Sequence, residues 1–303
     1  MINRRLALVA PLVAAPLALL ASCTKLDALN GLNTLVPGDG GARKLANGVV
    51  LGPDVRQRLD VWGPERVTTP LPVIIWFYGG SWNSGDRAGY AFVARALVAR
   101  GFMVVVPDYR LAPETRFPGF VQDGAAAVAW TAQNIATYGG DPARIALMGH
   151  SAGAHIAMLL ALDKTYGVAD RLKAVVGLAG PYDFLPLTPG GAADVALGGA
   201  KDMAQTQPIS FARPDAPPVL LLHGDEDTTV QPGNSRRLAA ALQAKGAAAE
   251  VKLYRGQGHI GILLACSKPF RGKAPVLADA TGFLTRVLAP AGAAAPSQPA
   301  QSR

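Results

Sequence analysis

The sequence predicts an α/β protein with a mostly parallel central sheet and helices on both faces. Two observations predict this class. Short apolar runs alternate along the chain with longer segments of helical pattern, which is the element order of a parallel sheet. The run at residues 73–77 is apolar throughout, as in strands that are buried on both faces. The chain has 303 residues, half of them apolar, so it is long enough to bury one large core.

The predicted elements follow one another between residues 49 and 288. An antiparallel edge pair comes first, at 49–51 and 58–62. The later strands are short and mostly apolar, and they are expected at 73–77, 103–106, 144–148, 173–178, 219–222 and 250–254. The helices are expected at 90–100, 120–137, 152–162, 235–245 and 275–288. In a parallel sheet a functional site lies beyond the carboxyl ends of the strands, so the residues directly after strands are the candidate functional residues.

The segment Gly149-His-Ser-Ala-Gly153 connects a predicted strand to a predicted helix of small residues. A G-x-S-x-G pentapeptide alone is weak evidence, but in the strand–turn–helix context it predicts a nucleophile elbow. The turn is so sharp that the flanking positions need glycine for strand and helix to pass closely. We therefore expect Ser151 to be a nucleophile.

A nucleophilic serine needs a base, and the base needs an orienting acid. Of the four histidines, His259 follows the last predicted strand in a Gly-rich loop and comes after both the serine and the acid candidates, so it is the expected base. We interpret the other three as structural: His150 points away from the serine's side of the elbow, His155 faces packing one helical turn later, and His223 ends a strand.

The acid lies in the turn after the strand at 219–222, where Asp225, Glu226 and Asp227 stand in sequence. Their position between serine and histidine fits the chain order Ser…Asp…His. Asp225 stays an alternative to Asp227, because a turn after a strand favours Asp for its own reasons.

The oxyanion of an acyl-transfer reaction needs backbone donors. The first is expected from the residue after the nucleophile, the Ala152 N–H, and the others from a loop after an earlier strand. Tyr78-Gly-Gly-Ser-Trp82 follows the strand at 73–77, and we expect the Gly80 and Ser81 N–H groups to donate. A plain turn is the alternative interpretation of the two glycines.

The chain from about Leu71 to Phe283 resembles the α/β-hydrolase-fold carboxylesterases, including the hormone-sensitive-lipase-like and kynurenine-formamidase-like groups. The motifs that carry the resemblance, besides the elbow, are Tyr78-Gly-Gly-Ser-Trp82, Asp108-Tyr-Arg-Leu-Ala-Pro-Glu114, Phe117-Pro118 and Gly140-Asp-Pro142. The family's H-G-x-x-D-x-x-V pattern implies Asp227 as the acid. The family's oxyanion signature is H-G-G-G or H-G-G-x-W, and this chain has Tyr78 in place of the histidine. This departure weakens the assignment to a subfamily more than the expectation of activity.

The resemblance implies a serine carboxylesterase that cleaves a small-molecule ester through an acyl-enzyme. Two alternatives stay open: an arylformamidase or peptidase with the same triad, and a non-catalytic surface lipoprotein that keeps the fold for binding. The segment 184–213 is expected to form part of the pocket wall. A dehalogenase is excluded on this interpretation, since it would need a carboxylate where Ser151 stands.

Apart from the ester substrate and a membrane contacted through the N-terminal segment described below, no partner or cofactor is expected. The formal net charge of +8 is diffuse, with no run of Lys or Arg longer than a pair, so a nucleic-acid partner is a poor interpretation. The absence of a Cys/His cluster and of a Walker-type loop predicts no metal and no organic cofactor. The second cysteine, Cys266, is expected to be a structural thiol.

The N-terminus has the pattern of a targeting segment. Arg4 and Arg5 precede an apolar stretch of about 15 residues, which is short for a membrane span. Leu20-Ala-Ser-Cys23 then resembles the lipobox of bacterial lipoproteins, which implies lipidation of Cys23 and an anchor in the cell envelope. The outer membrane is favoured over the inner, because Thr24 is not an acidic retention signal. An ordinary secretory signal cleaved near Ala21 is the alternative.

These segments divide the chain into four parts. Residues 1–22 are the expected lipoprotein signal peptide and 23–47 a tether. Residues 48–288 are the expected α/β-hydrolase catalytic domain. Residues 289–303 are rich in Ala, Pro, Ser and Gln and are expected to be disordered.

Overall fold

The central sheet has eight strands in the order β1-β2-β4-β3-β5-β6-β7-β8. The structure is a computed structural model that describes residues 38–290. The strands are β1 (Ala42–Val50), β2 (Arg58–Pro64), β3 (Leu71–Phe77), β4 (Met103–Pro107), β5 (Gly140–His150), β6 (Leu172–Leu178), β7 (Val219–Gly224) and β8 (Ala249–Tyr254). Strand β2 is antiparallel to β1 and to β4, and the strands from β4 across to β8 are parallel. The predicted edge pair and the mostly parallel sheet are therefore confirmed.

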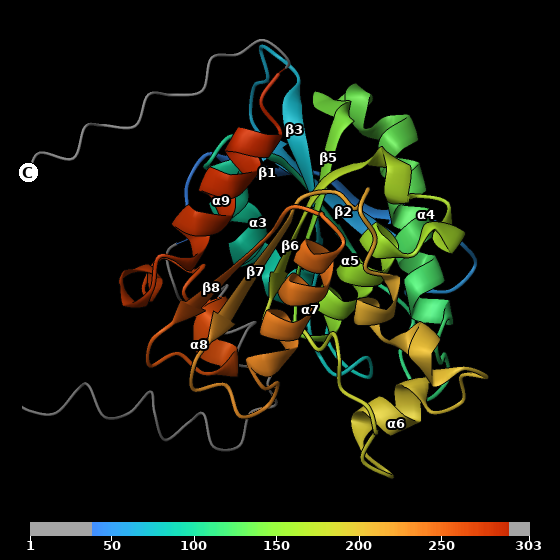
Figure 1. The fold of residues 1–303 in the computed structure, drawn as a ribbon. Coiled ribbons are helices and arrows are strands. Elements are labelled where there is room, and N and C mark those ends of the chain that lie inside the picture. The colour runs from blue at the N-terminus through green and yellow to red at the C-terminus, as the bar shows by residue number, and fades with distance from the viewer. Residues whose placement is uncertain (1–37, 291–303) are drawn as a thin grey trace, which may run out of the picture.

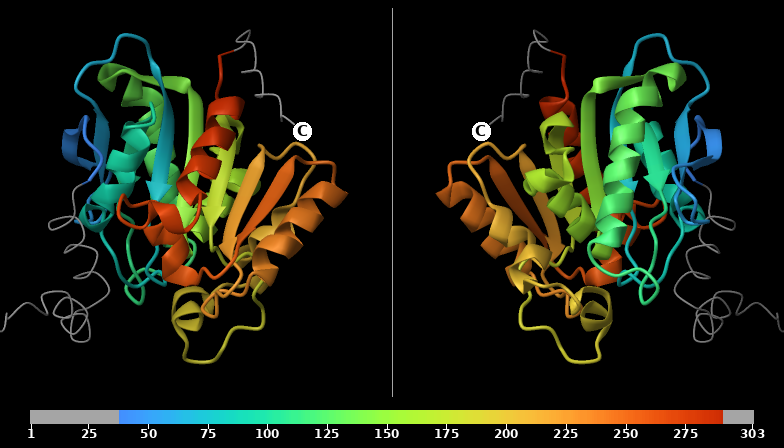
Figure 2. Two further views of the ribbon diagram at one scale, coloured as in Figure 1. Left: turned by 90° about the vertical axis from the view of Figure 1, so that its left-hand side faces the viewer. Right: turned by 90° about the vertical axis from the view of Figure 1, so that its right-hand side faces the viewer.

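Helices cover both faces of this sheet (Figure 1). Helices α3 (Ala91–Val98) and α9 (Val276–Val287) lie on one face. The other face is covered by α4 (Gly119–Asn134), α5 (Ala152–Leu162) and α7 (Gly233–Ala244). Two short helices were not predicted, α6 (Ala192–Leu197) and α8 (His259–Leu264). Figure 2 shows α6 beyond the ends of the strands, in the segment expected to form a pocket wall.

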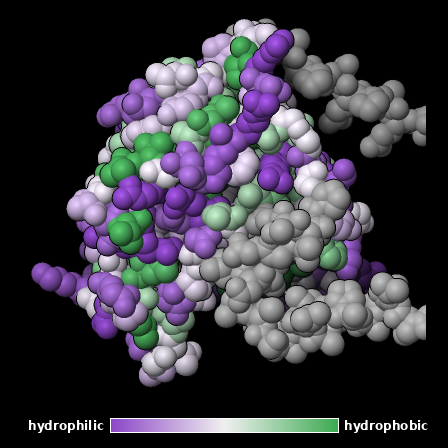
Figure 3. Space-filling model, turned by 180° about the vertical axis from the view of Figure 1, so that it is seen from behind, coloured by the Kyte–Doolittle hydropathy of each residue, from purple (hydrophilic) through white to green (hydrophobic). Residues whose placement is uncertain are grey.

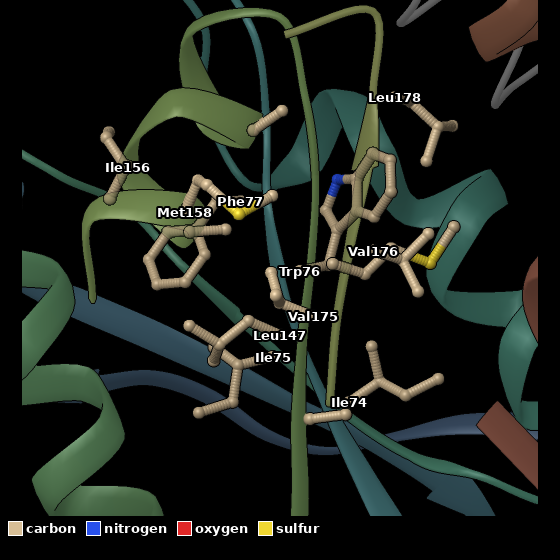
Figure 4. Close-up of a cluster of buried hydrophobic side chains, with 14 of the residues drawn as sticks. Ile74, Ile75, Trp76, Phe77, Leu147, Ile156, Met158, Val175, Val176 and Leu178 are labelled. Carbon is tan, nitrogen blue, oxygen red and sulfur yellow. The ribbon is translucent and has the colours of Figure 1, made fainter. Parts of the chain in front are cut away.

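The core lies between the sheet and its helices, and the period of two along β3 builds it. Ile75 and Phe77 point toward α5, whereas Ile74 and Trp76 point to the opposite face (Figure 4). All four side chains are fully buried. Such two-sided burial requires a strand that is apolar at every position, which is why this run could be recognised in the sequence.

The expected boundary between tether and domain at residues 47 and 48 is too late. Strand β1 already begins at Ala42 and pairs with β2 from Ala42 opposite Pro64. All nine of its residues are half-buried or exposed, because it is an edge strand, so no apolar run marks it. The leader, the expected lipidation site Cys23 and residues 291–303 of the expected tail lie outside the described residues.

One face of the domain is mixed in polarity. Figure 3 shows the face behind the view of Figure 1, where hydrophobic residues occur in small groups among hydrophilic ones. Within residues 38–290, no helix combines the length and the apolar character that crossing a bilayer requires.

Candidate active site

Ser151 stands alone between the end of β5 and the start of α5 in a strained conformation. Its backbone angles are φ 54° and ψ −123°, a region that non-glycine residues adopt at a cost of about 1–3 kcal/mol. A Cβ on Gly149 would lie 2.5 Å from the Gly153 carbonyl oxygen, and one on Gly153 would lie 2.2 Å from the Phe77 carbonyl oxygen. Only glycine fits at these two positions, so the local geometry is that of the predicted nucleophile elbow.

The three expected triad side chains lie in one hydrogen-bonded chain. The Ser151 Oγ is 2.9 Å from the His259 Nε2, and the His259 Nδ1 is 2.8 Å from the Asp227 Oδ2. They come from the β5–α5 turn, the first residue of α8 and the loop after β7. A carboxylate only accepts hydrogen bonds, so the His259 Nδ1 donates and its Nε2 is free to accept the serine proton.

The carboxylate of Asp227 is buried and bound by four donors. Its Oδ1 accepts from the backbone N–H groups of Thr229 and Val230, both at 2.9 Å. Its Oδ2 accepts from His259, and the His223 Nε2 lies 3.3 Å away. Burial raises the pKa of this carboxyl, but the hydrogen bonds from His223, His259 and Val230 outweigh it, and the pKa falls below its usual value. Asp227 is therefore a stable anion beside His259.

The side chain of Asp225, the alternative acid, binds a neighbouring loop. Its Oδ1 accepts from the Gly256 N–H at 2.8 Å, which ties the loop after β7 to the loop after β8. Of the two aspartates, it is Asp227 whose side chain contacts His259.

His150 is hydrogen-bonded to the backbone of the expected base, His259. Its Nε2 donates to the backbone carbonyl of His259 at 3.0 Å, because a carbonyl can only accept. Burial, and then the neighbouring His259, lower the pKa of His150 to about 3, so the ring is neutral. His150 therefore holds the chain that carries the base, a role that the sequence interpretation as a plain structural residue did not include.

His155 joins three parts of the site. Its Nδ1 accepts from the Trp82 indole at 3.2 Å and its Nε2 donates to the Thr206 carbonyl at 2.7 Å. Burial lowers its pKa to about 4. The neutral ring links the loop after β3, helix α5 and the segment between β6 and β7.

The loop after β3 presents three consecutive carbonyls that each accept a hydrogen bond. Tyr109 donates its hydroxyl to the Tyr78 carbonyl at 2.9 Å, and Tyr90 donates to the Gly79 carbonyl at 3.2 Å. The Gly80 carbonyl accepts from two backbone N–H groups at 3.0 Å. Each of these carbonyls shares a trans peptide with the N–H of the next residue. The N–H groups of Gly79, Gly80 and Ser81 therefore point in the direction opposite to the hydrogen-bonded carbonyls of the residues before them.

This loop lies directly against the elbow. A Cβ on Gly79 would be 3.0 Å from the Ser151 Cβ. Positive φ angles follow at Gly80 (139°), Ser81 (51°) and Trp82 (59°), which a non-glycine residue adopts only when its surroundings fix it. The loop that carries the expected oxyanion donors thus lies beside Ser151 and contains residues in strained conformations.

Tyr78, which stands where the resembling family has histidine, supports this loop. Its buried ring stacks on Tyr90 and Tyr109 with centroids 5.3 Å and 4.7 Å away. Its hydroxyl donates to the Asp108 carboxylate and accepts from Arg56, both at 2.9 Å. Burial raises its pKa well above the usual value, so the hydroxyl stays protonated and keeps both contacts.

The segment between β6 and β7 packs against the loop after β3. Phe184 stacks on Trp82 with ring centroids 6.2 Å apart. Next to it, an open pocket of about 550 Å³ is lined by Leu185, Pro186, Leu187, Asp194, Gly198 and Met203. Among residues 38–290, no three His, Cys, Asp or Glu side chains converge as a metal site would require.

Comparison with known proteins finds relatives that are named as esterases. Residues 59–242, more than half of the chain, match the family model BD-FAE. A probable isoprenylcysteine alpha-carbonyl methylesterase of Oryza sativa subsp. japonica is 32% identical over 256 residues, which are 76% of this chain and 60% of that protein. Esterase LipC of Mycobacterium tuberculosis is 35% identical over 220 residues, 65% of this chain and 54% of that protein. The chain thus spans little more than half the length of these relatives.

Solved structures give the fold. An esterase B from Lactobacillus rhamnosis aligns with a TM-score of 0.74 at 21% identity and covers 91% of this chain and 97% of that chain. A thermostable esterase from Pseudomonas putida aligns with a TM-score of 0.72 at 23% identity, covering 86% and 88%. The predicted α/β-hydrolase fold is therefore confirmed.

Proposed function

The chain belongs to the BD-FAE family, and from that premise and the contacts of Ser151 we propose that it is a serine carboxylesterase. The observation that carries the proposal is the hydrogen-bonded chain from Ser151 through His259 to Asp227. It supplies a nucleophile, a base in the correct tautomer and a buried anion to stabilise the imidazolium. The esterase names of its relatives support the same reaction class.

The proposed reaction has two halves. The Ser151 Oγ attacks the ester carbonyl carbon while His259 takes the hydroxyl proton, and the carbonyl oxygen becomes an oxyanion. The intermediate then expels the alcohol, which receives the proton from His259 and leaves Ser151 acylated. Water, deprotonated by His259, then attacks the acyl carbon. The second intermediate expels the Ser151 Oγ, which takes the proton back from His259, and the acid is released.

The oxyanion is proposed to bind between the N–H groups of Gly80, Ser81 and Ala152. Ala152 is the first residue of α5, so its N–H has no carbonyl partner within the helix. The start of α5 also carries a partial positive charge that favours an anion. Such donors are each worth about 3–4 kcal/mol of transition-state stabilisation in other enzymes.

The test is a substrate screen with the purified protein and its Ser151→Ala variant. p-Nitrophenyl esters of graded chain length, an isoprenylcysteine methyl ester and N-formylkynurenine distinguish simple esters, the ester named for the plant relative, and a formamide. We expect turnover of esters and a loss in kcat of about 10⁴–10⁶ in the variant. Ligand binding without turnover of any compound would favour the non-catalytic alternative, and preference for the formamide would favour an arylformamidase.

We also propose that the protein is held in a bacterial cell envelope by lipid on Cys23. The support is the residue pattern Leu20-Ala-Ser-Cys23 after an apolar stretch that follows Arg4 and Arg5. The attached acyl chains, not a helix of the domain, would supply the membrane affinity.

A further inference from the structure

Tyr90 is a buried residue whose hydroxyl meets the loop after β3. It ends a short 3-10 turn, Ala88–Tyr90, that leads into α3. Its ring contacts those of Tyr78 and Trp76, with centroids 5.3 Å and 6.3 Å away. The hydroxyl donates to the Gly79 carbonyl at 3.2 Å. Burial raises the pKa of this hydroxyl far above its ordinary value, so it remains a donor at any pH at which the enzyme would work.

The contact fixes a peptide plane rather than a side chain. The Gly79 carbonyl and the Gly80 N–H belong to the same planar trans peptide, so they point in opposite directions. A rotation of this peptide moves both groups together. Glycine on both sides lowers the torsional restraint on this rotation, so a hydrogen bond to the carbonyl contributes to fixing it.

The next peptide is restrained differently. The Gly80 carbonyl, which shares its peptide with the Ser81 N–H, accepts from the backbone of Asn83 and Ser84 and from the Ser84 hydroxyl, all within 3.0 Å. The Gly79 carbonyl has one donor among the described residues, the Tyr90 hydroxyl. Among the described residues, the Tyr90 hydroxyl is therefore the hydrogen-bond donor that restrains the direction of the Gly80 N–H.

We propose that Tyr90 is a positioning residue that aims the Gly80 N–H at the oxyanion; the inference rests on the proposed esterase function. Negative charge accumulates on the substrate oxygen only as the tetrahedral intermediate forms. A misaimed N–H therefore weakens binding of the transition state much more than binding of the ester, and the loss is in kcat rather than in KM.

The test compares Tyr90→Phe with Tyr109→Phe. Both variants lose one buried hydroxyl from the same aromatic stack around Tyr78. The Tyr109 hydroxyl binds the Tyr78 carbonyl, whose peptide carries the Gly79 N–H and not a proposed oxyanion donor. Each variant is measured for kcat and KM on the best ester, for its free energy of unfolding, and for its inhibition constant with an alkylboronic acid. That inhibitor forms a tetrahedral adduct with the nucleophilic serine.

We expect Tyr90→Phe to lower kcat about tenfold with KM within about twofold, and to weaken the boronic acid by a similar factor. Tyr109→Phe should lower kcat less than about threefold even if it destabilises the fold as much or more. The free energy of unfolding distinguishes a positioning role from a structural role, because a purely structural tyrosine would affect kcat only through the folded fraction.

Two results would overturn the inference. One is an unchanged kcat and boronic-acid affinity in Tyr90→Phe, and the other is an equal loss in both variants that follows their destabilisation. Neither touches the proposed function, which is tested by the wild-type protein and Ser151→Ala. An inactive wild-type protein would instead reject the esterase proposal itself.

Discussion

The Nε2 of His223 lies 3.3 Å from the same Asp227 oxygen that accepts from His259. His223 is fully buried, and its Nε2 also donates to the Val230 carbonyl at 2.9 Å while its Nδ1 lies 2.7 Å from the Ser235 hydroxyl. Because a carbonyl and a carboxylate can only accept, the Nε2 carries a proton that faces both acceptors. The acid of the proposed triad is thus held from its own strand, β7, as well as from its loop.

Replacement of His223 should weaken catalysis through Asp227. His223→Phe keeps a ring of similar size but removes the donor, so the carboxylate loses one of the contacts that lower its pKa and fix its direction. We expect kcat to fall about tenfold with little change in KM. Ser235→Ala is the matched control, since it removes a contact of the same ring but leaves the Nε2 donor in place. A greater loss in the control than in His223→Phe would refute this role.

Asp227→Asn and Asp225→Asn should differ by orders of magnitude. The asparagine at 227 can present an N–H to His259 and stabilise the wrong tautomer, so we expect kcat to fall about 10³–10⁴-fold. Asp225→Asn should cost less than about fivefold, because its oxygen can still accept from Gly256. Steady-state kinetics of the two variants on one ester decide the matter, and the reverse ranking would transfer the role of the acid to Asp225.

Stability should fall in mild acid because two buried histidines must stay neutral. Their pKa values are about 3 for His150 and about 4 for His155 in the folded protein, against an ordinary value of 6.5. Between these values the unfolded chain binds more protons, so the free energy of unfolding rises with pH. Each histidine should therefore cost about 2 kcal/mol between pH 7 and pH 5.

Urea unfolding at pH 7 and pH 5 measures this effect. In His155→Gln, which cannot titrate at this position, the difference in stability between the two pH values should shrink by about half. His155→Gln also replaces the ring nitrogen that accepts from Trp82, so its stability at pH 7 is compared separately. An unchanged pH difference in the variant would show that His155 is not the group responsible.

Much of the fold could be predicted because its strands are buried on both faces. Strands β3, β4 and β7 are continuous apolar runs, and α5 follows the elbow without a break. The first residues of β1 escaped prediction because that strand lies at the edge of the sheet with many exposed residues. Helices α6 and α8 have six residues each, too few to show a period of 3.6.

The proposed site could be predicted where local sequence controls geometry. The elbow needs its two glycines, and chain order selects His259, so residue pattern alone is enough to single out the nucleophile and the base. Asp225 and Asp227 occupy one turn, and only the direction of each carboxylate separates them. Tyr90 gave no signal, because its apolar ring fits the predicted helix at 90–100 and its hydrogen bond to Gly79 depends on packing between separate segments.

The membrane attachment proposed for Cys23 can be tested independently of activity. The full-length protein expressed in a bacterium should fractionate with membranes, because the bacterial modification adds several acyl chains, and more than one chain is needed for stable anchoring. Cys23→Ser should release or mislocalise the protein while the purified domain keeps its ester kinetics, since the described fold begins after this residue. Intact-mass analysis of the mature N-terminal peptide is the decisive measurement. An unmodified terminus at or after Cys23 would identify the leader as an ordinary secretory signal and remove the anchor from the proposal.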